Sequence, residues 1–186
     1  MFATSKIACM RYLMACMLVA LPLLAVGCNT KTAATPENFI AGLNAHFMDH
    51  PDCLFPESPR FPYETSDPVK TKQMNTLVAS LLLTVAEEHS IHVSRYTLTD
   101  VGARVAPRFC YGHRYITGIE SSTTPTMING FPETQIIYRY SMAEVPVWAK
   151  STDVKTAFPV MAHNISGTAT DKATLAGTQV GWQVPD

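Results

Sequence analysis

Acidic residues are absent from the first 36 positions of the sequence, and the first one is Glu37. Lys6 and Arg11 give this N-terminal part a positive charge, and the apolar run from Tyr12 to Val26 follows them. The run is shorter than the roughly 20 residues that a membrane-spanning helix needs, and Pro22 interrupts it. A short basic start followed by an apolar run of this length is typical of a secretory signal peptide.

Basic residues are too few in the rest of the chain for a nucleic-acid-binding surface. Without residues 1–27 the 14 basic residues fall to 12, against 15 acidic ones, so the net charge is −3. A domain that binds nucleic acid carries clustered Lys and Arg, because each phosphate contact needs a positive charge. We therefore expect no nucleic-acid partner. No second apolar run is long enough to span a membrane.

Catalytic and cofactor motifs are also missing. The sequence contains no GxSxG motif, no glycine-rich phosphate loop and no CxxC pair. His46 and His50 are one helical turn apart, a spacing that can hold a metal, but the glutamate of an HExxH motif is absent and Phe47 turns this helix towards a core. We interpret both histidines as polar residues at a helix end. The sequence predicts no catalytic residue, no metal site and no cofactor.

Cys28 ends the sequence AVGC (residues 25–28), directly after the apolar run. This stretch resembles the bacterial lipobox, in which small residues precede a cysteine that is acylated before the signal peptide is removed. The resemblance implies a signal peptide over residues 1–27, lipidation at Cys28 and a tether over residues 28–34. Asn29 implies, by analogy with enteric bacteria, an outer-membrane protein that faces the periplasm. An ordinary secretory peptide and an uncleaved anchor are the alternatives.

Two cysteines remain once the signal peptide and the lipid are taken into account. The sequence has five cysteines, of which two lie in the predicted signal peptide and one is Cys28. Cys53 and Cys110 would both reach an oxidising compartment, where two cysteines most simply form a disulfide. The alternatives are a metal site and a catalytic thiol, for which a dyad of Cys110 with His113 is the candidate.

Hydrophobic periodicity predicts two helices in the first half of one domain, residues 35–186. Thr35 can cap the first helix, which covers residues 36–50. Five prolines within residues 51–68 predict an ordered, extended loop. The second helix is predicted over residues 68–88. Its buried stripe is predicted to consist of Met74, Leu77, Val78, Leu81, Leu82 and Val85.

The second half of the domain is predicted to consist mainly of strands. Alternating apolar residues predict strands over residues 92–99, 109–121 and 133–142, and the last two are expected to pair antiparallel. A short helix capped by Ser151 is predicted over residues 152–158. The chain is expected to end in a strand with one face made of Val180, Trp182 and Val184. Together these elements predict an α+β fold, with N-terminal helices packed against a small antiparallel sheet.

Residues 75–82, a short hairpin, and then YTLTDVG (residues 96–102) resemble the helix-wing-helix pattern of winged-helix domains. The resemblance implies that this segment packs as it does in such domains. A helix that reads DNA would carry Arg, Asn, Gln and Ser on its open face, next to a basic wing. Residues 75–102 contain few basic residues, so the resemblance concerns packing alone.

The wider pattern over residues 70–185, with YTLT, FCYG and P.WA in this order, resembles a group of small lipoproteins from Gram-negative bacteria. The residues that match the pattern are Tyr96, Gly102, Cys110, Tyr111, Gly112, Pro146 and Trp148. The group has no established activity. The resemblance therefore implies only a cell-envelope location and a single domain.

Aromatic residues of the second half form the candidate binding surface. They are Tyr111, Tyr115, Tyr138, Tyr140 and Trp148. If their strands pair, these side chains can line a sheet face, either as core or as a platform for a partner. We expect a non-enzymatic, lipid-anchored protein that binds a protein or another envelope component. The alternatives are an immunity-type inhibitor of a periplasmic toxin and an envelope hydrolase or redox enzyme.

Overall fold

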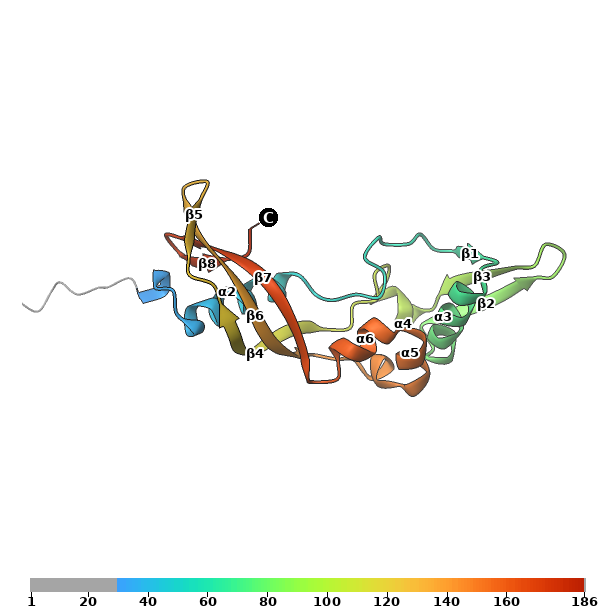
Figure 1. Cartoon of the computed structure of the whole chain (residues 1–186). Coiled ribbons are helices and arrows are strands. Elements are labelled where there is room, and N and C mark those ends of the chain that lie inside the picture. Colours follow the sequence, from blue (N-terminus) through green and yellow to red (C-terminus); the bar gives the residue numbers. More distant parts are fainter. Residues whose placement is uncertain (1–29, 186) are drawn as a thin grey trace, which may run out of the picture. The chain divides into compact units, whose positions relative to one another are not determined.

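A computed structural model of the chain describes residues 30–185 and divides the chain into two units, Met1–Thr30 and Lys31–Asp186. The predicted signal peptide and the predicted lipidation site Cys28 lie outside the described residues. The second unit starts at Lys31 and contains all the helices and strands that Figure 1 labels. No helix in the described part of the chain is long and apolar enough to cross a membrane.

The first long helix, α2 (Pro36–Asp49), follows a short 3-10 turn, η1 (Thr30–Thr32), and begins as predicted. The Thr35 side chain accepts a hydrogen bond from the Asn38 N–H, and Pro36 occupies the first turn, where no backbone donor is needed. Phe39 and Leu43 are buried. The Asn44 Oδ1 atom accepts a hydrogen bond from the Ile116 N–H at 2.9 Å, which ties the helix to the edge of the larger sheet.

The larger sheet is antiparallel, with the strand order β4-β6-β7-β8 and with β5 paired to β6 outside this path. Its strands are β4 (His113–Ser122), β5 (Thr126–Ile128), β6 (Phe131–Ala143), β7 (Ala169–Thr178) and β8 (Gly181–Gln183). The predicted pairing of the two central strands is confirmed, with Ile116 opposite Tyr140. Along β6, Ile136 and Tyr138 are buried while Ile137 between them is exposed, as the alternation of a strand requires.

The C-terminal end of the chain differs from its prediction. A turn at Gln179 and Val180 separates β7 from β8, so the last segment is a hairpin and not one strand. Val180 is exposed in this turn, whereas Trp182 is buried, and the two residues therefore do not share a strand face. Gly181 has a φ of 130°, a backbone conformation that glycine adopts without strain.

A smaller antiparallel sheet has the strand order β1-β3-β2. Its strands are β1 (Tyr63–Thr65), β2 (Leu83–Glu88) and β3 (Val93–Leu98), and helix α3 (Pro68–Ala79) packs beside it. The predicted helix over residues 68–88 is therefore wrong in its second half. Hydrogen bonds from Leu81 N to Val78 O and from Leu82 N to Leu77 O, both 2.9 Å, close the helix and turn the chain into β2.

The early end of α3 changes the predicted buried stripe. Met74, Leu77 and Leu82 are buried as expected, and Val78 is half-buried. Leu81 and Val85 are exposed. Leu81 points outward because it occupies the bend after the helix, and Val85 because it lies in a strand, where helical spacing no longer decides which side faces the core.

Short helices lie in two connections, one from β3 of the smaller sheet to β4 of the larger sheet and one from β6 to β7 within the larger sheet. They are α4 (Asp100–Ala103), the 3-10 helix η2 (Val147–Lys150), α5 (Thr152–Ala157) and α6 (Pro159–Asn164). Ser151 caps α5 as predicted, since its Oγ accepts from the Val154 N–H at 3.2 Å. Pro159 ends α5 but also starts α6, which the sequence did not predict, because proline is tolerated in a first helical turn.

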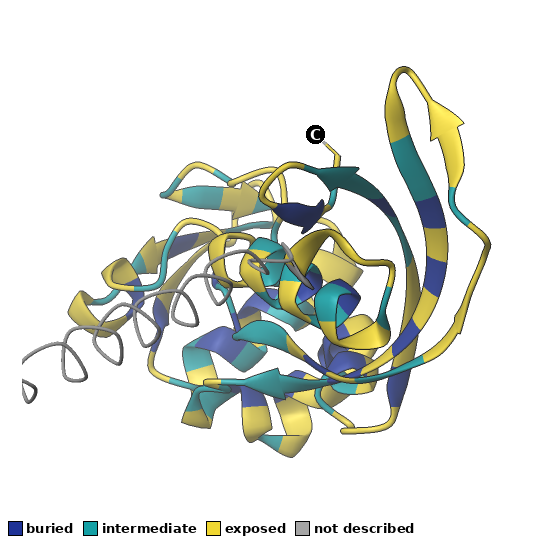
Figure 2. Cartoon of the chain, turned by 90° about the vertical axis from the view of Figure 1, so that its left-hand side faces the viewer, coloured by how far each residue is buried: buried dark blue, intermediate teal, exposed yellow. Residues whose placement is uncertain are grey.

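Buried side chains form two clusters, and the ribbon of Figure 2 is dark blue at the buried residues. One lies between α3, the smaller sheet and α5 and α6, and it includes Leu77, Tyr96 and Phe109. The other lies between α2 and the larger sheet. The α+β fold is thus confirmed, with two antiparallel sheets and their helices. The segments α3, β2–β3 and α4 follow each other in the predicted order, while their likeness to winged-helix domains stays a prediction.

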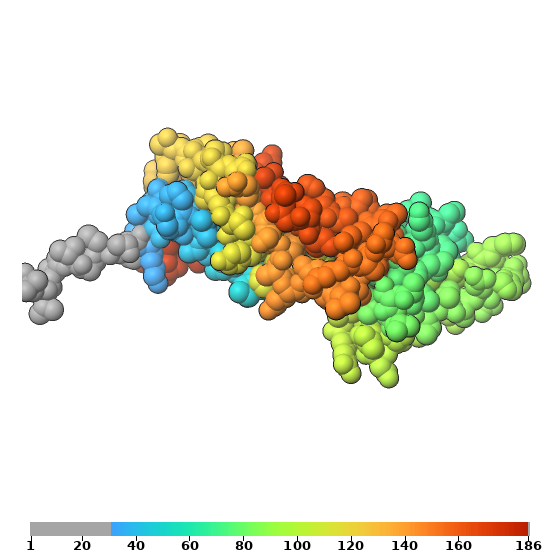
Figure 3. Space-filling model, turned by 90° about the horizontal axis from the view of Figure 1, so that it is seen from below, coloured from blue at the N-terminus to red at the C-terminus, as the bar shows by residue number. Residues whose placement is uncertain are grey.

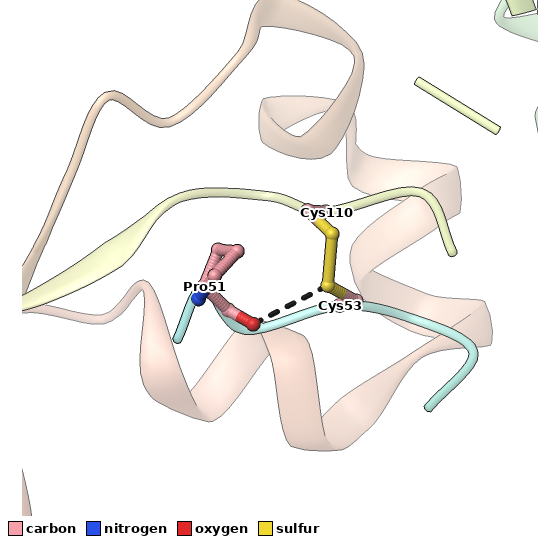
Figure 4. The surroundings of a disulfide bond; sticks show 3 residues. All are labelled: Pro51, Cys53 and Cys110. Atoms are coloured by element: carbon pink, nitrogen blue, oxygen red, sulfur yellow. Dashed lines mark hydrogen bonds between the residues drawn. A yellow bond between two sulfur atoms is a disulfide. The ribbon is translucent and has the colours of Figure 1, made fainter. Parts of the chain in front are cut away.

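Cys53 and Cys110 lie at disulfide distance, as predicted (Figure 4). The two residues face each other in an isolated antiparallel bridge, with their Cα atoms 3.7 Å apart. Backbone hydrogen bonds continue on both sides, from Tyr111 N to Asp52 O at 2.8 Å and from Leu54 N to Phe109 O at 3.1 Å. The proline-rich loop is therefore held to the chain before β4. Its apolar residues pack against the core, namely Leu54, Phe55, Phe61 and Tyr63.

Candidate functional site

The five aromatic residues predicted as a binding surface do not share one exposed face. Tyr111, Tyr138 and Tyr140 are at most 3% exposed, so these three belong to the core. Tyr138 and Tyr140 are buried because alternate residues of β6 face α2. Tyr115 is 56% exposed. Trp148 in η2 is half-buried and packs against the cluster between α3, the smaller sheet, α5 and α6. Of the two alternatives for the aromatic set, core or binding platform, the three buried tyrosines follow the first.

Arg114 in β4 occupies the centre of a polar network around these tyrosines. Its Nε donates to Asp52 Oδ2 at 3.0 Å and its Nη2 to Asp52 Oδ1 at 3.2 Å, a two-point ion pair. Its Nη1 donates to Asp171 Oδ2 at 2.6 Å and to the Tyr138 hydroxyl at 3.1 Å. The guanidinium lies 4.7 Å from the ring centre of Tyr140. One side chain therefore connects β4, β6, β7 and the loop before Cys53.

Asn164, at the end of α6, extends the network between the two core clusters. Its Nδ2 donates to the Tyr111 hydroxyl at 2.8 Å, and its Oδ1 accepts from the Tyr140 hydroxyl at 3.0 Å. Tyr111 belongs to one cluster and Tyr140 to the other. Sequence reasoning did not single out Arg114, Asn164, Asp52 or Asp171, since no motif joins positions that lie so far apart along the chain.

Burial controls the ionisation of the network. Burial and then the Asp52 charge raise the pKa of Tyr111 to about 12. Burial also raises the pKa of Tyr138 to about 12, against the opposing effect of Arg114. Burial lowers the pKa of Arg114, but hydrogen bonds to Asp52 and Asp171 outweigh it and raise that pKa above its ordinary value. The tyrosines thus stay neutral and Arg114 stays charged near neutral pH. With these groups paired to one another, the network serves to hold the strands together.

The histidine and cysteine candidates do not come together as a reactive centre. The rings of His46 and His50 stack with their centres 4.1 Å apart, and His50 Nδ1 lies 2.7 Å from the His46 carbonyl oxygen. Within residues 30–185, no group of three His, Cys, Asp or Glu residues is close enough to hold a metal ion. The Cys110 sulfur is joined to Cys53, so it offers no free thiol to His113.

Trp148 lines a hollow together with three large exposed apolar side chains and several small or polar residues. Leu81 is 74% exposed, Val101 53% and Val147 85%, and with Trp148 they line a hollow of about 470 Å³. These four residues are named the Trp148 surface below. They come from the bend after α3, from α4 and from η2. Large exposed apolar residues that gather around one hollow are typical of a binding surface.

Gly102 and Thr99 hold α4 against the bend that contains Leu81. A Cβ atom on Gly102 would overlap the carbonyl oxygen of Leu82, so only glycine allows this close approach. The Thr99 hydroxyl donates to the Leu81 carbonyl oxygen at 2.8 Å and accepts from the Gly102 N–H at 2.9 Å. The position of Val101 beside Leu81 is therefore fixed by the backbone.

Leu81 has a left-handed backbone, with a φ of 62°. This position after a helix usually holds glycine, and a residue with a side chain pays about 1–2 kcal/mol for the conformation. The Leu81 side chain is mostly exposed, so its packing within the domain offsets little of the cost of the left-handed conformation. Folding alone does not explain a leucine at this position.

The Trp148 indole offers its ring, and not its N–H, to the outside. Its Nε1 atom is buried and has no hydrogen-bond partner in the described part of the chain. Because this atom is buried, a partner that approaches the hollow would meet the exposed part of the ring. The chemistry of the Trp148 surface is therefore apolar contact.

Comparison with known proteins gives no family for this chain. No protein-family model matches it. No curated protein and no solved structure matches it either. The resemblances to small lipoproteins and to winged-helix domains therefore stay predictions, and the functional argument depends on the geometry of the site.

Proposed function

We propose that this protein is a lipid-anchored, non-enzymatic lipoprotein of the cell envelope that binds a protein partner through the Trp148 surface. The anchor is Cys28, and the support for it is the basic and apolar N-terminus followed by AVGC. Asn29 favours the outer membrane and a domain that faces the periplasm. The Cys53–Cys110 pair supports an oxidising compartment of this kind.

The observation that carries partner binding is the exposed, left-handed Leu81 beside Val147. Backbone strain of this kind tends to occur at functional sites, because a residue chosen for folding alone would avoid it. Fully burying a Leu or Val side chain contributes roughly 1.5–3 kcal/mol, so a partner that covers Leu81, Val101 and Val147 has a substantial driving force. Asp153 also lines the hollow, which favours a partner with a basic residue next to its apolar group.

Photo-crosslinking in cells tests partner binding. A photoreactive amino acid at Val147 of the full-length protein is expected to give a discrete crosslinked product with a protein. Val160 in α6 is the matched control, since it is also an apolar residue and is 73% exposed. Absence of a product from Val147, or the same products from Val160, would contradict a specific partner at the Trp148 surface.

Acyl labelling tests the anchor separately. Wild-type protein is expected to incorporate a labelled fatty acid and to sediment with membranes, whereas Cys28→Ala is expected to lose the label and the sedimentation, or to accumulate as precursor. Cys53→Ser is the control, because it removes a cysteine without touching the lipidation site. A Cys28→Ala variant that is labelled and membrane-bound like the wild type would show that the chain is not a lipoprotein.

A further inference from the structure

We propose that the tip of the β5–β6 hairpin touches the lipid surface in which the protein is anchored. The apolar hairpin tip consists of Met127, Ile128 and Phe131, which are 69%, 43% and 50% exposed. Ile128 and Phe131 face each other across the turn at Asn129 and Gly130. Figure 2 shows this tip in yellow at the top of the picture. The inference depends on the lipid anchor of the proposed function.

The hairpin tip has the composition of a lipid-contacting loop. Residues 121–132 contain no charged side chain, although Glu120 and Glu133 flank them. Exposed strand edges of soluble proteins usually carry charges, often lysine, that prevent association with other chains. β5 lies at such an edge without any charge. Charged groups are costly in the hydrocarbon interior of a bilayer and apolar ones are favoured at its boundary, so this tip suits lipid better than water.

The base of the hairpin lies close to the start of the described unit. The Pro132 ring stands directly against Gly177, which pairs with Trp182 in β8. The Trp182 Nε1 donates to the Ala33 carbonyl oxygen at 3.0 Å. Figures 1 and 3 both show the hairpin, in yellow, at the same end of the unit as its first residues, in blue.

The short tether keeps this end of the unit near the membrane. Lys31 is the third residue after Cys28. Even a fully extended chain covers only about 3.6 Å per residue, so the lipid-bearing sulfur can be no more than on the order of 15 Å from Lys31. Val180, 70% exposed in the β7–β8 turn, adds another apolar side chain near Lys31, since the Lys31 carbonyl oxygen approaches Gly181. An apolar, uncharged tip at the tethered end has the bilayer as its nearest apolar surface.

Fluorescence quenching by brominated lipid tests the contact. The full-length acylated protein is reconstituted into vesicles of phosphatidylethanolamine and phosphatidylglycerol, with or without bromine on the acyl chains. Phe131→Trp is compared with Ile91→Trp, which lies in the β2–β3 turn and is 65% exposed. After subtraction of the wild-type signal from Trp148 and Trp182, bromine is expected to reduce the emission of Phe131→Trp at least twofold and to leave Ile91→Trp unchanged.

Other outcomes would overturn the membrane contact. Equal quenching of both variants, or no quenching of Phe131→Trp, contradicts it, and blue-shifted emission without quenching means that a protein or a second copy covers the tip. Met127→Trp is a second probe in case Phe131→Trp does not fold. Vesicle flotation separates the two proposals: protein that floats without quenching contradicts only the hairpin contact, whereas full-length wild-type protein that fails to float contradicts the anchor as well.

Discussion

The Arg114 guanidinium holds the Asp52 carboxylate at two points, with Nε and Nη2 at 3.0 and 3.2 Å from its two oxygens. The side chains of Arg114 and Asp52 are only 15% and 18% exposed. Asp52 directly precedes Cys53, so this ion pair and the disulfide hold the same loop to β4 and the residues before it. The loop is therefore fixed by a charge pair and a covalent bond side by side.

Loss of Arg114 should destabilise the domain strongly. Arg114→Met leaves the largely buried Asp52 carboxylate without its partner, for which we expect a cost of about 3–5 kcal/mol in the free energy of unfolding. Arg139→Met is the matched control, because Arg139 is 60% exposed and its pair with Glu120 is 3.7 Å long. That variant should cost less than about 1 kcal/mol. Urea denaturation of the mature chain measures both, and equal costs would show that the Arg114 network contributes little.

Reduction of the disulfide should also destabilise the domain. Cys53 and Cys110 are 57 positions apart, and closing a loop of this length contributes on the order of 4 kcal/mol through the unfolded state. Dithiothreitol is expected to lower the melting temperature of the wild-type chain clearly and to expose the proline-rich loop to protease. The Cys53→Ser, Cys110→Ser double variant should melt at the same temperature as the wild-type chain in dithiothreitol, whether or not reductant is added. A wild-type chain that melts identically in both conditions would speak against a stabilising disulfide.

The buried tyrosines should make the domain sensitive to alkali. The folded pKa of Tyr111 and Tyr138 is about 12, above the ordinary 10.0, so their contribution is complete below pH 10 and is lost as the pH rises through 12. The free energy of unfolding should fall by roughly 2 kcal/mol for each tyrosine by pH 12. Tyr138→Phe should reduce this fall, whereas exposed Tyr115→Phe should not. Urea midpoints between pH 8 and 12 measure the difference, and identical pH profiles for the two variants would be the contrary result.

Local signals were sufficient for much of the fold. The caps at Thr35 and Ser151 depend on a side chain next to its own helix, and the alternation along β6 reflects burial of a single face. Local signals of this kind did not predict the end of α3. The apolar residues from Leu77 to Val85 fit helical spacing as well as a strand, and the bend at Leu81 lacks the glycine that usually marks it.

The candidate site was less accessible to sequence reasoning. Trp148 was predicted as a binding residue. Leu81 was expected in the core because the predicted helix over residues 68–88 extended beyond the observed end of α3. The polar network joins Arg114 to Asp52 and to Asp171. Each carboxylate is about 60 positions from Arg114 along the chain, so no spacing motif brings them together. The buried state of Tyr138 and Tyr140 follows from which face of β6 meets α2, and alternation alone does not specify this.

Leu81→Gly tests the Trp148 surface most directly, because binding and folding should respond in opposite directions. Glycine relieves the left-handed backbone, so the free energy of unfolding should stay the same or rise by about 1 kcal/mol. Removal of the exposed side chain should nevertheless reduce the crosslinked product from a photoreactive residue at Val147 severalfold. Undiminished crosslinking in a stable Leu81→Gly variant, or a clear loss of stability, would contradict a leucine retained for partner binding.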